Sequence, residues 1–412
     1  MKKPSNKKVI LAISDVGTTG IAESLRGPLL HWHEKGHEIW HLGLGFSGWP
    51  SSKTQRKMYP WYQRLIPVHT TGQLTDKFGQ KQIGRAVATS KCDFVITSFD
   101  AWMISYLSNP EVRDDLDKAT KDIIGHTKRE FQHIAYFPMD SAVQGMYLPA
   151  GMDEMIAGFD IPVTYSRFAQ QILMRDTGLA VPFIPISHDP KIFHPGDRMK
   201  ARKSLDFENI KDKFVVAMVG TNQYRKHYGE FFDVVAPFAK AHPDDVLIMP
   251  VTTWDTKIAG GTEIKDCIWR HDLMKQTIDP SQFVGALTEE GMANLYRSID
   301  VLLLCTAGEG AGLPPLRARA CGIPALVSNN TSNSEFCADD FERVPCTGKY
   351  LDPFGSNLER YTTDIGEMRR RLEILYENKV FRNELGQKGI QEMKAYEFDR
   401  VNPSWDALLE NH

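Results

Sequence analysis

Short apolar runs alternate with amphipathic segments along this chain, and the whole alternation occurs twice. In the first half the apolar runs lie at 9–14, 38–44, 94–97, 133–137 and 163–165. In the second half they lie at 214–219, 246–251, 283–284, 301–304 and 325–327. Short strands separated by helices form parallel β-α-β units, whose sheets carry helices on both faces. We therefore predict an α/β protein built from two Rossmann-like, doubly wound domains.

The chain length agrees with this division. A chain of 412 residues exceeds one ordinary core, and two domains of about 200 residues fit it. We place the first domain at 1–190 and the second at 191–395, because a segment rich in proline, glycine and charge separates the two patterns. We expect a C-terminal helix at 396–412 that crosses back to the first domain. Ligands bind beyond the carboxyl ends of parallel strands, so the two sheets are expected to face a cleft.

Composition narrows the function classes. Apolar residues make up 42% and charged residues 25%, with a net charge of −3, so the chain as a whole is not an electrostatic nucleic-acid binder. No apolar run is long enough to predict a transmembrane helix, and no signal-peptide cleavage site follows the basic start. The six cysteines form no Cys-x-x-Cys motif. We expect free thiols and a cytoplasmic protein; contact with a membrane surface stays open, and nothing indicates the oligomeric state.

The stretch 296–335 carries the most specific signal. A strand at 301–304 leads into a glycine-rich turn at 308–312, and a helix is expected to begin near Leu313, since prolines follow that are tolerated in a first helical turn. A strand, a glycine loop and a helix start together form an anion site, because N–H groups and the helix dipole point at the ligand. Glu309 lies in this turn, where a carboxylate suits the hydroxyl groups of a sugar.

This stretch resembles the donor-binding signature of the retaining GT-B glycosyltransferases known as glycosyl transferases group 1, or family 4. The family pattern is Asp-Val, a short strand, and then Glu-Gly-Phe-Gly-Leu-Pro-x-Leu-Glu-Ala-x-Ala-x-Gly-x-Pro. The matching positions are Asp300, Val301, Glu309, Gly310, Gly312, Leu313, Pro314, Leu316, Ala318, Ala320, Gly322 and Pro324. The resemblance implies that Glu309 contacts the donor sugar. The N–H groups expected at the diphosphate are those of Gly310, Ala311, Gly312 and Leu313. An ordinary Rossmann turn is the alternative, which so many matches in register disfavour.

One position departs from the family pattern. Arg317 stands where the family has a second glutamate that holds the donor ribose, and an arginine cannot accept hydrogen bonds. Either the ribose is held in another way, or Arg317 meets a donor phosphate or an acceptor anion, or its side chain turns to solvent. The departure also supports an alternative function, a catalytically inactive GT-B binding module. A further alternative is another two-domain enzyme, such as a nucleotide-sugar epimerase or a sugar phosphorylase.

A second match follows the strand at 214–219, where Gly220 opens a polar loop that ends in Arg225 and Lys226. The resemblance implies that Lys226, with Arg225 beside it, pairs with the donor diphosphate. Departure of a nucleoside diphosphate builds negative charge, which fixed cations stabilise. Thr221 occupies the position of the family's other basic residue. A solvated basic pair in a loop is the simpler alternative.

Two loops of the first half complete the predicted site. The loop after the first strand contains Gly17 and Thr18, and by position it resembles the family's glycine-rich loop near the donor phosphate. Asp140 follows the strand at 133–137, where the family often has a histidine near the sugar. It is a candidate for contacting the sugar or an acceptor hydroxyl, or else for capping the next helix. No metal ion and no cofactor are expected, because the Asp-x-Asp motif at 115–117 lies in a charge run typical of a solvated helix face.

A basic and aromatic stretch follows the second strand, on the acceptor side in this family. It contains no acidic residue between Glu38 and Asp76. The acceptor-side candidates are Lys53, Arg56, Lys57 and Trp61. Such a composition suits nucleic acid and also an anionic membrane surface, and a loop with packed aromatics is the third alternative. Prolines in the stretch disfavour a basic amphipathic helix, so nucleic acid is favoured over lipid.

The resemblance thus implies a metal-independent, retaining hexosyl- or pentosyltransferase that uses a nucleotide sugar. Catalysis is assigned to Glu309, Lys226 and Asp140. The favoured acceptor is a hydroxylated base in DNA, with a lipid, polysaccharide or small-molecule acceptor as the alternative.

Overall fold

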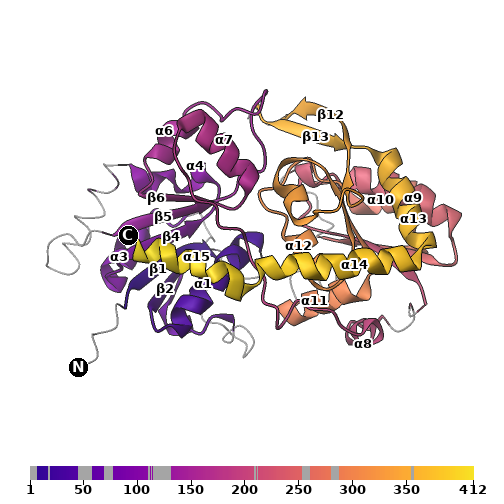
Figure 1. The fold of residues 1–412 in the computed structure, drawn as a ribbon, viewed down its shortest axis with the longest axis horizontal. Helices are drawn as coiled ribbons and strands as arrows, with labels where there is room; N and C mark the ends of the chain where they lie inside the picture. Colours follow the sequence, from indigo (N-terminus) through magenta and orange to yellow (C-terminus); the bar gives the residue numbers. More distant parts are fainter. Residues whose placement is uncertain are drawn as a thin grey trace. The chain divides into compact units, whose positions relative to one another are not determined.

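Two compact units make up the chain (Figure 1). The computed structural model describes residues 7–16, 19–44, 58–68, 78–109, 112, 114, 131–207, 210, 212–252, 260–279, 287–353 and 357–412. The first unit consists of Met1–Met139, Leu148–Ser187 and Val401–His412, and the second of Asp140–Tyr147 and His188–Arg400. The segment Asp140–Tyr147, which the sequence places in the first half, therefore packs with the second unit.

The first unit contains a parallel six-stranded sheet with the order β3-β2-β1-β4-β5-β6. Its strands are β1 (Val9–Asp15), β2 (Glu38–Leu44), β3 (Leu65–Pro67), β4 (Phe94–Ser98), β5 (Gln132–Phe137) and β6 (Ile161–Thr164). Its helices are α1 (Gly20–Glu34), α3 (Ile83–Ser90), α4 (Ala101–Ile104), α6 (Met152–Ala157) and α7 (Arg167–Thr177), with 3₁₀ turns η1 (Tyr62–Arg64) and η2 (Ser105–Ser108). This order is that of Rossmann folds, and the strands are mostly apolar and buried, as expected where helices cover a parallel sheet on both faces.

The last helix, α15 (Phe398–Glu410), packs against α1 from Val401 onward (Figure 1). The rings of Trp32 and Trp405 meet edge to face, with centroids 5.8 Å apart. At the rim of this contact, Asp406 Oδ2 lies 2.9 Å from His31 Nε2. An aromatic pair contributes about 0.5–1.5 kcal/mol beyond its buried area, so the Trp32–Trp405 pair helps to attach α15 to α1.

The second unit contains a parallel five-stranded sheet with the order β11-β10-β9-β7-β8. Its strands are β7 (Phe214–Val219), β8 (Val246–Val251), β9 (Val301–Leu304), β10 (Ala325–Ser328) and β11 (Arg343–Val344). Its helices are α8 (Arg198–Ser204), α9 (Tyr228–Ala241), α10 (Ile264–Arg270), α11 (Glu289–Ser298), α12 (Leu313–Ala320), α13 (Ile365–Glu377) and α14 (Lys379–Met393). Its 3₁₀ turns are η4 (Tyr224–Lys226), η5 (Thr331–Phe336) and η6 (Lys394–Tyr396). The prediction of two Rossmann-like sheets is confirmed; the strand predicted at 283–284 lies outside the described residues.

An antiparallel hairpin, β12 (Cys346–Leu351) and β13 (Glu359–Thr363), follows the second sheet. It was not predicted, because its strands are polar and do not show the apolar runs used to find the others. The main chain of β13 joins the loop after β9, since Tyr361 N donates to Ala307 O at 3.1 Å. The hairpin therefore borders the loop that carries the family signature.

The matched Asp300 has a structural role in this unit. Its carboxylate accepts hydrogen bonds from Val215 N at 3.0 Å and from Arg202 Nη2 at 3.2 Å. Asp300 and Arg202 are both almost fully buried. A buried carboxylate requires such partners, and these tie α8 to β7.

We expect that Gly386→Ala destabilises the protein by about 1–3 kcal/mol, the usual cost of overpacking. A Cβ atom at Gly386 would lie 2.2 Å from the carbonyl oxygen of Gly322, so α14 would have to move away. Urea unfolding measures the loss. Gly229→Ala in α9 is the control, since no heavy atom lies within 4 Å of its added Cβ, and it should not destabilise the protein. Equal stability of wild type and Gly386→Ala would contradict this close packing.

Candidate donor-binding site

Two loops at the carboxyl edge of the second sheet form the candidate site. One follows β7 and ends in the 3₁₀ turn η4, and the other follows β9 and leads into α12. Because β7 and β9 are neighbours in the sheet, the loops meet at one edge, where open α/β sheets bind ligands. The loops are joined at Arg225, whose carbonyl oxygen accepts from Ala307 N at 2.7 Å and from Thr306 Oγ1 at 3.1 Å.

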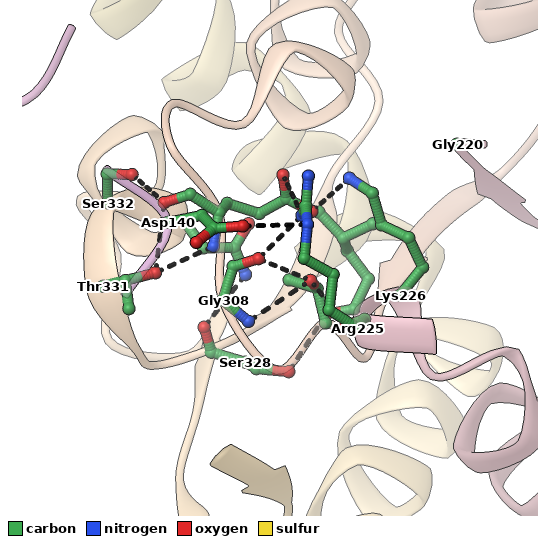
Figure 2. Close-up of polar contacts among 12 residues, drawn as sticks. Asp140, Gly220, Arg225, Lys226, Gly308, Ser328, Thr331 and Ser332 are labelled. Carbon is green, nitrogen blue, oxygen red and sulfur yellow. Dashed lines mark hydrogen bonds and ion pairs between the residues drawn. The ribbon is translucent and has the colours of Figure 1, made fainter. Parts of the chain in front are cut away.

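The centre of the site is a buried ion pair between Lys226 and Glu309 (Figure 2). Lys226 is 7% exposed and Glu309 is 5% exposed. Arg225 adds a second cation, with its Nη1 atom 3.2 Å from Glu309 Oε2. The same nitrogen donates to Gly308 O at 2.8 Å. The structure thus brings together the three side chains that the sequence assigned to the donor diphosphate and sugar.

Asp140 extends this cluster. Its carboxylate lies 3.0 Å from Arg225 Nε and 3.1 Å from Arg360 Nη1, and Arg360 Nε donates to Asp352 Oδ2 at 2.9 Å. Three cations and three carboxylates therefore alternate from Lys226 to Asp352. An arriving anion would compete with the carboxylates for the cations, so the cluster is suited to exchanging a protein carboxylate for a phosphate.

The main chain approaches closely at the edge of the cluster. A Cβ atom at Gly308 would lie 2.2 Å from Asp140 O and 3.1 Å from Arg360 Nη1. Only glycine fits a position where two backbones meet in this way. Gly308 thus allows the segment Asp140–Tyr147 to sit against the signature loop.

The neighbouring cations lower the pKa of Glu309. Burial alone would raise the pKa of Glu309, but the cations of Lys226 and Arg225 lower it to about 2. Burial also lowers the pKa of Lys226, and Glu309 opposes that shift. Glu309 is therefore a carboxylate, with a fixed negative charge, at every pH near neutrality.

We expect the contribution of Glu309 to the free energy of unfolding to decrease at acid pH. The pKa of Glu309 in the folded protein is about 2, below its ordinary value of 4.5. Its contribution is therefore complete above pH 4.5 and falls as pH drops toward 2. Urea unfolding between pH 3 and pH 7 should show the difference between wild type and Glu309→Gln shrinking on the acid side. Exposed Glu377→Gln is the control, and a Glu309→Gln difference that is constant with pH would contradict the expectation.

The start of α12 provides the anion-binding backbone. The helix begins at Leu313, as predicted, with Gly312 as its N-cap in the left-handed region at φ 91°. Gly310, Ala311 and Gly312 are buried. The N–H groups of a first helical turn have no partner within the helix, and the helix dipole adds positive potential there. This backbone therefore complements the cations of Lys226 and Arg225.

The side chain of Arg317 is buried, which contradicts only the alternative that turns it to solvent. Its side chain is 7% exposed, and its guanidinium stacks over the ring of Phe193, 4.3 Å from the centroid. Arg317 Nη2 also lies 3.5 Å from Glu289 Oε1 of α11. The side chain is therefore buried, and these contacts lie outside the cluster around Glu309. The structure thus gives Arg317 a packing role, and the family's ribose-binding position has no carboxylate here.

The acceptor-side candidates find little support. Trp61 is 2% exposed, and its ring packs edge to face against Tyr59 at 5.9 Å and His33 at 5.8 Å. It therefore does not offer a free face to a base, and the third sequence alternative, packed aromatics, describes it better. The predicted residues outside the described ranges are Gly17, Thr18, Lys53, Arg56 and Lys57. Thr221 is exposed in the loop after β7.

The sequence analysis missed Arg360 and Asp352 of the charged cluster, and also His227 and Thr331. His227 directly follows Lys226 and has a left-handed φ of 53°, with Nδ1 3.1 Å from Glu230 Oε1 and Nε2 2.6 Å from Tyr350 Oη. Thr331 contacts the main chain of Glu309. The position of His227 beside Lys226 was a possible signal, whereas Thr331 had none, because its contact depends on the fold.

Within the described ranges, His, Cys, Asp and Glu side chains form no group of three or more that could hold a metal ion. In the same part of the chain, every helix is too short or too polar to cross a membrane.

Comparison with known proteins finds a matching family and several distant relatives. The model of the family "Glycosyl transferases group 1" matches residues 200–388. A D-inositol 3-phosphate glycosyltransferase of Stackebrandtia nassauensis is 24% identical over 219 residues, 52% of this chain and 48% of the relative. A GDP-mannose-dependent α-(1-6)-phosphatidylinositol dimannoside mannosyltransferase of Mycobacterium tuberculosis is 27% identical over 192 residues, 45% of this chain and 46% of the relative. The match thus spans about half the length of these curated relatives.

A solved structure extends the likeness to nearly the whole chain. The sucrose-phosphate synthase of Thermosynechococcus elongatus superposes with a TM-score of 0.71 at 14% identity, covering 98% of this chain and 99% of that protein. At this identity the likeness establishes the fold. Residues 200–388 thus match the glycosyl transferases group 1 family, and the chain, with its two parallel sheets, has the GT-B fold.

Proposed function

We propose that this protein is a metal-independent, retaining glycosyltransferase that moves a sugar from a nucleoside-diphosphate sugar to an acceptor hydroxyl. The observation that carries the proposal is the buried cluster of Lys226, Arg225 and Glu309, set beside the N-terminus of α12. Breaking the bond between sugar and diphosphate leaves negative charge on the diphosphate. Fixed cations and N–H groups stabilise that charge without a metal ion.

Each side chain has a distinct part in this proposal. Lys226 and Arg225, with the N–H groups of 310–313, take the developing charge of the diphosphate. Glu309 accepts hydrogen bonds from sugar hydroxyls once the diphosphate has replaced it at the cations. Asp140 keeps Arg225 and Arg360 oriented, and its side chain is 28% exposed, so it is also the candidate for contacting the sugar or the acceptor.

For the acceptor, we propose a hydroxyl group of a lipid, a polyol or a polysaccharide. The sequence favoured nucleic acid over lipid, whereas the following observations favour the alternative acceptor class. Trp61 is buried, and the named relatives act on D-inositol 3-phosphate and on a phosphatidylinositol dimannoside. These names support the alternative acceptor class.

A nucleotide panel tests the proposal. The melting temperature should rise with one of UDP, GDP, ADP, dTDP and CMP, because a ligand that binds only the folded protein stabilises it. The matching nucleotide sugar should then release nucleoside diphosphate with phosphatidylinositol vesicles or inositol phosphate as acceptor, and not with duplex DNA. Binding without turnover would support the inactive module, and turnover that requires inorganic phosphate would support a phosphorylase. No stabilisation by any nucleotide would refute a donor site.

A further inference from the structure

Thr331 has a backbone conformation that is costly for its residue type. Its φ angle is 39°, in the region that favours glycine, and threonine is branched at Cβ. Such a conformation costs on the order of 1–3 kcal/mol and persists where the surrounding structure imposes it. Strained residues of this kind cluster at functional sites, so the contacts of Thr331 are informative.

The hydroxyl of Thr331 contacts both backbone groups of Glu309 (Figure 2). Thr331 Oγ1 accepts from Glu309 N at 2.9 Å and lies 3.2 Å from Glu309 O and 3.2 Å from Asn330 Oδ1, either of which it can donate to. The neighbouring Ser332 Oγ donates to Glu309 O. Two successive hydroxyl side chains thus hold the N–H and the C=O of a single residue.

Glu309 needs this support because of its neighbours in the sequence. It lies between Gly308 and Gly310, in a loop outside any helix or strand, and glycine allows a wide range of backbone angles. Nothing in the regular structure therefore fixes the direction of its side chain. The hydroxyls of Thr331 and Ser332 supply the backbone partners that a helix or strand would otherwise provide.

The contact also determines the direction of one N–H group in the turn, that of Glu309. Since Glu309 N donates to Thr331, this N–H is directed into the protein and not toward a ligand. The side chain of Glu309 is then aimed at Lys226 and Arg225. One hydroxyl thus sets the carboxylate on the cation side of the turn.

We propose that Thr331 is a positioning residue for Glu309, and that its strained backbone is retained because its hydroxyl fixes the main chain of Glu309. The proposal rests on the proposed function, in which the carboxylate of Glu309 must meet the donor sugar. Thr331 acts through Glu309 and does not itself touch the reacting atoms.

Three substitutions at one position separate positioning from general stability. Thr331→Val keeps the shape and the branch but removes the hydroxyl, and kcat should fall about 10- to 100-fold, as for other small misplacements. Thr331→Ser keeps the hydroxyl and should retain most of the turnover. Thr331→Gly relieves the strain, so its melting temperature should equal or exceed that of wild type while its kcat is as low as that of Thr331→Val. The dissociation constant of the nucleoside diphosphate should stay within about threefold in all three variants. A contact that acts only in the transition state lowers kcat without weakening ground-state binding.

Hydrogen exchange provides a readout that needs no turnover. In wild type and Thr331→Ser the amide of Glu309 should be protected, and in Thr331→Val and Thr331→Gly it should exchange faster. Equal exchange of that amide in Thr331→Val and wild type would overturn the proposal, as would equal kcat values of Thr331→Val and Thr331→Ser. If wild type turns over no nucleotide sugar, the proposed function fails, and the exchange measurement alone decides whether Thr331 holds Glu309.

Discussion

Replacing Lys226 with alanine is expected to lower kcat about 10²- to 10³-fold, the usual effect of removing one fixed group that stabilises developing negative charge. The ammonium of Lys226 is buried beside Glu309, where water cannot replace it. Its charge matters most when the bond to the diphosphate breaks, so KM for the donor should change less than kcat. Steady-state kinetics with the donor found in the nucleotide panel measures both constants.

The control for this substitution is Lys388→Ala. Lys388 also pairs with a carboxylate, with Nζ 2.8 Å from Asp339 Oδ2, but it lies on α14, outside the cluster. Its removal should leave kcat within about twofold, since exposed ion pairs contribute little. Circular dichroism and melting temperature check that Lys226→Ala is folded. A folded Lys226→Ala enzyme with wild-type kcat would remove Lys226 from the mechanism.

The second large effect is expected from Glu309→Gln, which should change turnover and product affinity in opposite directions. Turnover should fall about 10²-fold or more, because the contact with the sugar is weakened in the transition state. The nucleoside diphosphate should bind about tenfold more tightly, equivalent to about 1.4 kcal/mol. The gain arises because the carboxylate of Glu309 no longer competes with the diphosphate for Lys226 and Arg225.

Glu289→Gln is the matched control for this experiment. Glu289 is also buried and is paired with an arginine, Arg317, in the same unit, but it lies outside the cluster. Isothermal titration with the nucleoside diphosphate should show unchanged affinity for Glu289→Gln. Weaker binding to Glu309→Gln than to wild type would show that Glu309 does not compete with the diphosphate.

The parts of the site that the sequence predicted depend on local rules. The start of α12 at Leu313 follows from glycine and proline at fixed positions, and a left-handed glycine precedes the helix. Most strands of both sheets follow from buried apolar runs, whereas the short edge strands β3 and β11 were not predicted. Lys226 and Glu309 were assigned through the resemblance to the family signature, and their loops meet because they follow β7 and β9, which are neighbours in the sheet.

The parts that the sequence did not predict depend on contacts between distant residues. Arg317 occupies the position of a ribose ligand, and only the fold shows that it stacks on Phe193. Thr331 is 22 positions from Glu309, and no local pattern connects them. Asp140 was assigned through its place after a strand, but its pairing with Arg360, 220 positions away, could not be foreseen.

The route of the chain limits how this protein can be divided. The polypeptide passes from one unit to the other after Met139, Tyr147, Ser187 and Arg400. A recombinant fragment starting at His188 would lack the segment that contains Asp140, and Arg225 and Arg360 would lose a shared carboxylate. Separate expression of halves cut at the linker would therefore alter the donor cluster itself, and kinetic or binding studies require the uncut chain.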